Sequence, residues 1–133
     1  MNDLMALYRM MGGLQSNMRI YLAGPMRNKP FMNKEAFMQA EVMLEQFGHT
    51  IFNPARMDME RYGKDVFDNC PTGDIDQLVR EKGFDMRRAL ADDCRVICET
   101  ADAIAFLPGW ENSSGCRAEH ALGVALGLRL FYL

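Results

Sequence analysis

Residues 103–107 are a short apolar run, Ala-Ile-Ala-Phe-Leu, and the turn residues at 108–109 end it abruptly. Such a run is typical of a strand that is buried on both faces. A polar loop over residues 110–115 follows, and residues 116–126 are helix formers. A strand, a loop and a helix N-terminus in this order form the anion-receiving corner of an α/β sheet. This stretch therefore favours an α/β fold.

The first turns of the helix over 116–126 carry the side chains that suggest chemistry. Ser113 or Ser114 is placed to cap the first turn. Glu119 lies about one turn inside the helix, on the edge of an otherwise small and apolar surface. A glutamate at such a place can simply interact favourably with the helix dipole. The alternative is a catalytic carboxylate, and the helix pattern alone leaves both interpretations open.

Strands and helices alternate along the rest of the domain. We expect strands over residues 19–23, 49–53 and 128–133, and helices over 33–47 and 84–100. Because a β-α-β unit requires parallel strands, the sequence predicts a three-layer α/β domain. Its sheet should be doubly wound, Rossmann-like or flavodoxin-like, with about four to five mainly parallel strands.

Two segments have less regular patterns. Residues 1–17 are interpreted as an N-terminal extension, because a glycine pair ends any helix there before the first strand, and the domain is placed at residues 18–133. Residues 54–83 hold many charges and few apolar side chains, so we expect a long loop with short helices, a typical setting for a functional lid. Asn33 is expected to cap the helix that it begins. The side chains expected to face inward from the helix over 84–100 are Leu90, Cys94, Ile97 and Cys98.

Composition restricts the partners. The chain has 133 residues, enough for one domain, and its net charge of -3 gives no basic surface for duplex nucleic acid. Free nucleotides stay possible, because one small anion needs only a local site. The sequence lacks both a phosphate-binding loop of the nucleoside triphosphatase type and a dinucleotide-binding glycine pattern. We therefore expect no cofactor.

The cysteines and the hydropathy indicate a compartment. Four cysteines and two histidines, His49 and His120, show no paired metal-ligand spacing, so we expect no metal site. Reduced cysteines are typical of a cytoplasmic protein. No apolar stretch is long enough to span a membrane, and the N-terminus lacks a signal-peptide pattern. The sequence thus predicts a cytoplasmic protein without membrane association.

Two loops should meet at the ligand-binding edge of the sheet, because each follows a parallel strand. They are residues 24–30 after the first strand and residues 108–115 after the third. We expect the pocket between them to hold Arg27 and the polar side chains of 112–114, with Glu119 facing them. Trp110 would either form the wall of a base pocket or close the core. Asn53 falls on the same edge, where it could equally serve only the strand end.

Three motifs carry a family resemblance: Tyr-Leu-Ala-Gly-Pro-Met-Arg at 21–27, Phe-Asn-Pro-Ala at 52–55, and Leu-Pro-Gly-Trp-Glu-Asn-Ser-Ser-Gly at 107–115 followed by Glu119. Over residues 18–133 the chain resembles the DUF4406 family, frequent in phages and prophages. That family is similar to the nucleoside 2-deoxyribosyltransferase superfamily, whose members cleave N-glycosidic bonds of deoxynucleosides or nucleoside 5′-monophosphates with a glutamate nucleophile. The resemblance places that nucleophile at Glu119. The substrate-binding residues that it implies are Tyr21, Gly24, Pro25, Arg27, Asn53, Gly109, Trp110, Asn112, Ser113, Ser114 and Gly115.

One comparison within the superfamily points to the substrate. Deoxyribosyltransferases carry an aspartate six residues before the nucleophile, whereas the monophosphate N-glycosidases carry a serine there and a glycine two residues later. This chain has Ser113 and Gly115 at those places, and a serine hydroxyl accepts a phosphate that a carboxylate would repel. The monophosphate enzymes also have Gly-Ser-x-Arg after the first strand; Arg27 matches, and Pro25 replaces the serine. Asp93 resembles the family aspartate near the sugar and base, and we assign it the role of an acid or a hydrogen-bonding group that helps the base to depart.

The resemblance implies hydrolysis of the N-glycosidic bond of (deoxy)nucleoside 5′-monophosphates. Base exchange between deoxynucleosides is one alternative, and a nucleotide-binding or sequestering protein without turnover is another. The superfamily completes its sites across subunits, so a homodimer or a larger homo-oligomer is expected. The choice of base, and of ribose or deoxyribose, stays open at this point.

Overall fold

The computed structural model describes residues 17–133. The predicted N-terminal extension, residues 1–17, lies outside the described residues except for Asn17. The Asn17 N–H donates to the Gly48 carbonyl oxygen at 2.9 Å, and the Met18 N–H donates to His49 Nδ1 at 3.3 Å. The described chain is thus attached to the rest of the domain from its first residues.

Four parallel strands form one sheet in the order β2-β1-β3-β4. They are β1 (Arg19–Ala23), β2 (Thr50–Phe52), β3 (Ala103–Phe106) and β4 (Arg129–Tyr132). Their register pairs Tyr21 with Phe52 on one side and with Ile104 on the other. The strand order reverses at the neighbours β1 and β3, where doubly wound sheets bind their ligands. The predicted α/β class and the parallel sheet are confirmed.

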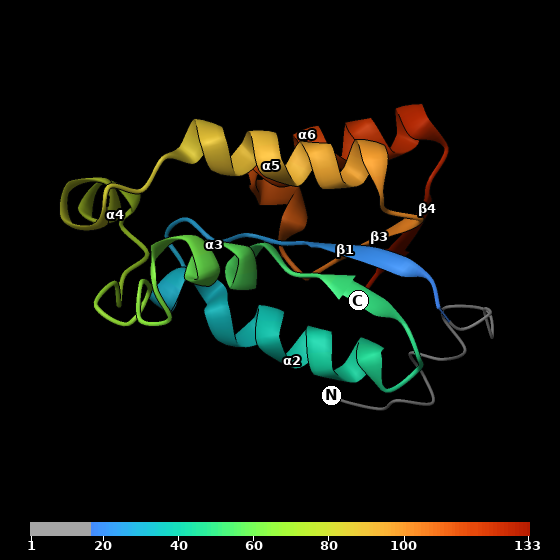
Figure 1. The fold of residues 1–133 in the computed structure, drawn as a ribbon. Coiled ribbons are helices and arrows are strands. Elements are labelled where there is room, and N and C mark those ends of the chain that lie inside the picture. Colours follow the sequence, from blue (N-terminus) through green and yellow to red (C-terminus); the bar gives the residue numbers. More distant parts are fainter. Residues whose placement is uncertain (1–16) are drawn as a thin grey trace.

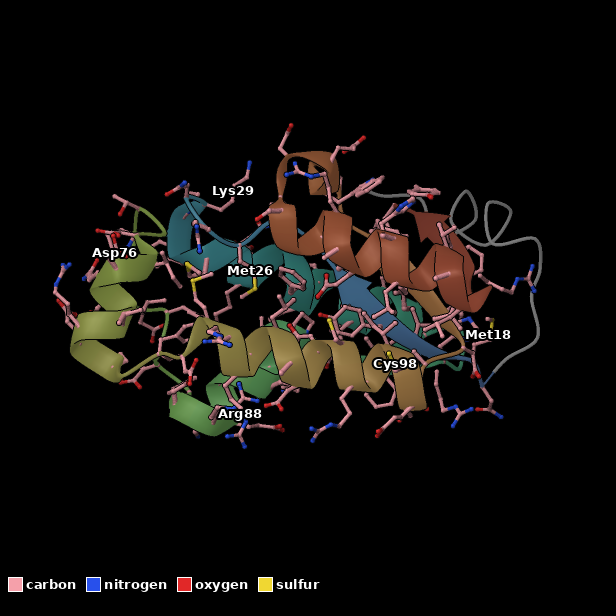
Figure 2. All side chains as sticks on the ribbon, turned by 90° about the horizontal axis from the view of Figure 1, so that it is seen from above. Met18, Met26, Lys29, Asp76, Arg88 and Cys98 are labelled. Carbon is pink, nitrogen blue, oxygen red and sulfur yellow. The ribbon has the colours of Figure 1, made fainter. Side chains whose placement is uncertain are left out.

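Helices cover both faces of this sheet, which makes three layers (Figure 1). Helix α2 (Lys34–Glu45) lies on one face, and α5 (Met86–Glu99) and α6 (Ser114–Leu126) lie on the other. Seen from above, α5 and α6 run side by side (Figure 2) and contact each other. Two more helices, α3 (Pro54–Tyr62) and α4 (Ile75–Lys82), lie together at one end of the domain.

The alternation of side chains along β1 divides the core into two clusters. Ile20 and Leu22 point to the α2 face, and Tyr21 and Ala23 point to the face covered by α5 and α6. All four are almost completely buried. Because strand side chains alternate with a period of two, the register of β1 places the Tyr21 hydroxyl beneath α6.

The segment 54–83 contains short helices, as the sequence predicted, but it also buries apolar side chains in the core. It contains α3 and α4, and Val66, Phe67 and Cys70 between them are fully buried in the α2-side core. The apolar residues of this segment are few, but they point into the core, and composition alone did not indicate their burial. The segment is an integral part of the core.

Details at helix ends and faces also differ from the predictions. Asn33 has a left-handed backbone and makes no side-chain cap; its Nδ2 instead donates to the Pro25 carbonyl oxygen at 2.9 Å. Leu90 and Cys98 are exposed rather than buried, while Ile97 is buried as expected. The capping residue of α5 is Asp85, so the helix begins two residues later than predicted.

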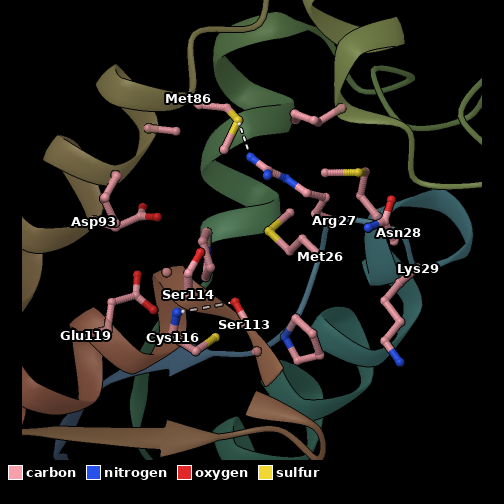
Figure 3. A pocket seen from close by; sticks show the side chains of 18 of the residues that line it. Met26, Arg27, Asn28, Lys29, Met86, Asp93, Ser113, Ser114, Cys116 and Glu119 are labelled. Carbon is pink, nitrogen blue, oxygen red and sulfur yellow. Dashed lines mark hydrogen bonds between the residues drawn. The ribbon is translucent and has the colours of Figure 1, made fainter. Parts of the chain in front are cut away.

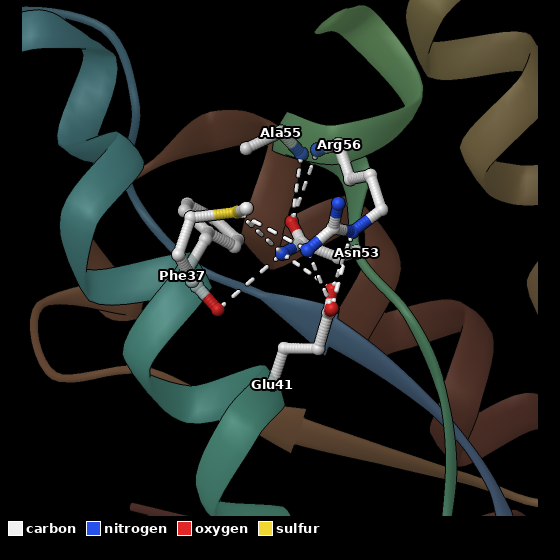
Figure 4. A network of polar contacts seen from close by, with 6 residues as sticks. Phe37, Glu41, Asn53, Ala55 and Arg56 are labelled. Atoms are coloured by element: carbon white, nitrogen blue, oxygen red, sulfur yellow. Dashed lines mark hydrogen bonds and ion pairs between the residues drawn. The ribbon is translucent and has the colours of Figure 1, made fainter. Parts of the chain in front are cut away.

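A polar network ties α3 to α2 (Figure 4). The buried Glu41 carboxylate accepts hydrogen bonds from Arg56 at 2.7 to 3.1 Å and from Asn53 Nδ2 at 3.0 Å. Asn53 Oδ1 caps α3 by accepting from the N–H groups of Ala55 and Arg56 at 2.9 and 3.3 Å. This network fixes the direction in which α3 leaves the sheet.

Candidate active site

A cavity of about 500 Å³ opens where β1 and β3 end, bounded by α3, α5 and the N-terminus of α6. Its volume is within the range of small-molecule sites. Most of the residues predicted from the sequence line it: Tyr21, Gly24, Pro25, Arg27, Asp93, Gly109, Asn112, Ser113, Ser114, Gly115 and Glu119. The structure thus brings together side chains from both predicted loops and two helices.

Glu119 is 5% exposed, yet no cation in the described chain pairs with it. The Tyr21 hydroxyl donates to Glu119 Oε2 at 2.8 Å. Tyr21 itself is fully buried in β1, so its hydrogen bond orients the carboxylate from the side of the sheet. Helix α6 supplies the backbone and β1 supplies the orienting group.

The electrostatics of this corner are those of uncompensated carboxyl groups. Burial, and after it the nearby Asp93, raise the pKa of Glu119 to about 8, against a smaller lowering by Tyr21. Burial raises the pKa of Asp93 to about 6. Strongly raised carboxyl pKa values in a cavity are typical of functional sites. The two groups interact, so they titrate as a pair.

The N-terminus of α6 forms the second part of the cavity. Ser113 Oγ accepts a hydrogen bond from the Cys116 N–H at 3.3 Å and so caps the helix, as predicted. The N–H groups of Ser114 and Gly115 lie in the first turn, where the helix offers them no acceptor. Together with the helix dipole they favour an anion.

Close backbone approach joins the two loops. A Cβ atom on Gly24 would lie 2.7 Å from Leu107 Cδ1, and one on Gly109 would lie 3.5 Å from Pro25 Cγ. Only a glycine at position 24 lets the ends of β1 and β3 come this close without a shift. The contact places the loop after β1 beside the N-terminus of α6.

The loop after β1 is held by the segment before α4. The N–H groups of Asn28 and Phe31 donate to the carbonyl oxygens of Gly73 and Cys70 at 2.9 and 3.0 Å. A Cβ atom on Gly73 would lie 2.3 Å from the Lys29 carbonyl oxygen. Asn28, Phe31 and its two successors have positive φ angles between 53° and 64°, a costly conformation for residues other than glycine. The two backbone bonds stabilise that strained path.

The cations of this loop lie across the cavity from the carboxyl groups (Figure 3). Arg27 Nη2 approaches Met86 Sδ at 2.7 Å and makes no ion pair in the described chain. Figure 3 shows Arg27 and Lys29 on one side, Asp93 and Glu119 on the other, and the serines of α6 between them. The cavity is thus polarised, with an anion-binding end and an acidic end.

Sequence reasoning missed Asp58. It lines the cavity from α3, is 5% exposed, and burial raises its pKa to about 7. Its only hydrogen bond in the described chain comes from Arg61 Nη1, at 3.2 Å to Oδ1. Asn53 followed by proline is a capping signal with proline at the first helical position, and it would have located α3 and placed Asp58 one turn inside.

Two predicted site residues lie outside the cavity lining. The Asn53 side chain serves the network with Glu41 and the α3 cap. Trp110 stacks on His120 with ring centroids 4.5 Å apart and packs on Phe106 at 4.8 Å. Of the two interpretations of Trp110, the structure thus favours closure of the core on the α6 side.

Within residues 17–133, no three histidine, cysteine, aspartate or glutamate residues are arranged to hold a metal ion. No helix there is long and apolar enough to cross a membrane.

The fold and the site define the chain as a doubly wound α/β domain with a polarised, acidic cavity at its strand ends. The family model described as domain of unknown function (DUF4406) matches residues 18–132, and the chain belongs to this family. No curated protein and no solved structure matches it.

Proposed function

We propose that this protein hydrolyses the N-glycosidic bond of (deoxy)nucleoside 5′-monophosphates, with Glu119 as nucleophile. The observation that carries the proposal is the buried, unpaired Glu119 carboxyl, oriented by Tyr21 at 2.8 Å, in one cavity with the capped N-terminus of α6. A nucleotide has a matching polarity, with an anionic phosphate at one end and a reactive carbon near its middle.

The anion-binding end supports a phosphate. The free N–H groups of Ser114 and Gly115 and the Ser113 hydroxyl lie at the helix N-terminus, and Arg27 lines the same cavity. An unphosphorylated sugar would leave Arg27 and the free N–H groups without a partner. This is the reason to prefer monophosphates over nucleosides.

The reaction would follow the logic of a retaining glycosidase. An Oε atom of Glu119 attacks C1′, the C1′–N bond breaks, and its electron pair leaves with the base, which takes a proton from Asp93. Water then attacks C1′, the ester bond to Glu119 breaks, and the water proton returns to Asp93. The products are the free base and a sugar 5-phosphate, and both side chains regain their starting states.

The raised pKa values determine which of the two carboxyl groups carries a proton before the substrate binds. At neutral pH Glu119, whose pKa is about 8, is mainly protonated, and Asp93, whose pKa is about 6, is mainly ionised. The positive charge that develops at C1′ favours ionised Glu119 and makes the proton available to Asp93. A high pKa also makes the Glu119 carboxylate a stronger nucleophile.

The direct test is to incubate the protein with nucleoside 5′-monophosphates and nucleosides and to measure by chromatography the free base that is released. Base release from monophosphates, dependent on Glu119, is the expected result. Release only when a second base is supplied would indicate base exchange. Binding of monophosphates without release of any common base would indicate a sequestering protein.

We also propose a homodimer or a larger homo-oligomer. Strand β4 is an edge of the described sheet and carries Tyr132, which is 44% exposed, and Val124 and Leu126 of α6 are 59% and 44% exposed. Apolar side chains next to a sheet edge are often covered by a partner. Light scattering at micromolar concentration should give at least twice the monomer mass, and a monomer mass would contradict the proposal.

A further inference from the structure

Asp58 has no part in the mechanism above, although it lines the same cavity. It projects from α3, while Asp93 projects from α5. The side chain of Asp58 is 7% exposed, comparable with that of Glu41. Unlike Glu41, it has half of its hydrogen-bonding capacity unused.

The two carboxylate oxygens of Asp58 have different surroundings. Oδ1 accepts from Arg61 Nη1 at 3.2 Å, and Arg61 Nη2 contacts Asp92 Oδ2. Within residues 17–133 no donor reaches Oδ2. Arg61 therefore fixes the orientation of the Asp58 carboxyl and leaves one oxygen for a ligand. Because no fully buried side-chain oxygen in residues 17–133 lacks a partner, Oδ2 is open to the cavity that Asp58 lines, where it can accept from a ligand N–H group.

The surroundings of Asp58 suit a planar ring. If the phosphate lies at the α6 N-terminus and C1′ at Glu119, the part of the cavity left for the base lies between α3 and α5. Its lining there is mainly apolar, with Pro54 from α3 and Ala89 and Leu90 from α5. An apolar slot with one fixed polar group is the usual form of a nucleobase pocket.

We propose that Asp58 determines base specificity, accepting a hydrogen bond through Oδ2 from the exocyclic amino group of the base. This inference rests on the proposed function. Cytosine and adenine present an amino group on their pairing edge, whereas uracil and hypoxanthine present a carbonyl oxygen at the corresponding position. A carboxylate oxygen attracts the amino group and repels the carbonyl oxygen. The substrate class is thus a monophosphate with an amino-bearing base.

Matched substrate pairs test this without any variant. Cytidine and uridine 5′-monophosphates, and adenosine and inosine 5′-monophosphates, differ at the amino position, and the deoxy series gives the same pairs. We expect kcat/KM for base release to favour the amino member of each pair roughly tenfold or more. Equal kcat/KM within both pairs would overturn the inference and leave the proposed function standing.

Asp58→Asn then assigns the preference to this residue. The amide keeps the size of the side chain and can turn an N–H donor toward a carbonyl oxygen, so the amino preference should vanish or reverse. Glu60→Gln is the matched control, because it makes the same change at an exposed position of α3, and it should keep the preference. A preference that persists in folded Asp58→Asn, or in Asp58→Ala if the first variant does not fold, contradicts the assignment.

Calorimetric binding in a Glu119→Gln background separates the two proposals. If the wild type releases no base, but Glu119→Gln binds the amino members more tightly and Glu119→Gln/Asp58→Asn does not, specificity by Asp58 holds and hydrolysis fails. If no monophosphate is bound or cleaved by any form, both proposals are overturned.

Discussion

The two buried glutamates of this domain, Glu41 and Glu119, have opposite surroundings. Glu41 is 7% exposed and accepts hydrogen bonds from Arg56 and Asn53. Glu119 is 5% exposed and receives one hydrogen bond, from the neutral Tyr21 hydroxyl. The chain is thus able to compensate a buried carboxylate with a cation, and at Glu119 it does not.

This contrast distinguishes a buried carboxylate that stabilises the fold from one that is suited to a chemical role. A buried ion pair that is fully hydrogen-bonded fixes the position of elements, here α3 against α2. A buried carboxyl without a cation destabilises the fold when it ionises, and such a cost is typical of sites where reactivity is needed.

The same substitution at both glutamates should give the largest difference. Glu119→Gln removes the proposed nucleophile, so base release should fall by at least about a thousandfold. Glu41→Gln should leave kcat for folded protein close to that of the wild type. The measurement is the steady-state rate of base release, with the folded fraction determined by circular dichroism. Full turnover by Glu119→Gln would remove the nucleophile assignment.

Arg27 and Arg56 differ in the same way as the two glutamates, and the second-largest predicted effect is on the KM for monophosphates. Arg27 lines the cavity without an ion pair, whereas Arg56 is bound to Glu41. Arg27→Met should raise KM for monophosphates about ten- to hundredfold, because a charge-assisted hydrogen bond to phosphate is lost. Arg56→Met should change KM little. Crystals soaked with phosphate should show density beside Arg27 and Ser113, and density elsewhere with this corner empty would contradict the anion site.

Stability should respond in the reverse order. Glu41→Gln breaks an ion pair that is buried on its glutamate side, while the Arg56 side chain is 45% exposed and can be solvated. We expect the free energy of unfolding to fall by about 1–3 kcal/mol, below the full value for a buried pair. Urea unfolding measures it. Glu119→Gln, which removes an uncompensated charge, should show no comparable loss.

The pH profile of kcat/KM should be bell-shaped, with limbs near the raised pKa values of the pair, about 6 and about 8. The Tyr21 hydroxyl lowers both pKa values through hydrogen bonding. Tyr21→Phe should therefore move the profile to higher pH and lower its maximum. A profile that keeps its position in Tyr21→Phe would show that Glu119 and Asp93 do not govern it.

A further prediction concerns stability against pH. Burial raises the folded-state pKa of Glu119 from 4.5 to about 8, so between these values the folded state binds more protons than the unfolded state. The free energy of unfolding should fall as pH rises through this window. Glu119→Gln should flatten the fall and be the more stable protein above pH 8, as thermal unfolding at several pH values would reveal. An equal pH slope in both proteins would contradict the raised pKa.

Prediction from sequence succeeded where neighbouring residues along the chain determine the local structure. The strand before residues 108–109 and the serine cap of α6 are set by local composition, so the order of strand, loop and helix over residues 103–126 was predicted correctly. It failed at Asp58 and at residues 66–70, because their burial depends on α3 and on contacts far along the chain. It also failed to find the partner of Glu41, which lies 15 residues away across two helices. Pairing of buried charges is a tertiary property.

The backbone hydrogen bonds between the loop after β1 and the segment before α4 have a thermodynamic consequence for binding. Asn28 and Phe31 have exposed side chains, but their N–H groups are already bonded to Gly73 and Cys70. A loop that is ordered before the ligand arrives loses little conformational entropy on association. Affinity for the anion can then come from few contacts, and its enthalpy should not be offset by a large entropic cost. A weakly charged domain can thus hold a small, doubly charged group in a single corner.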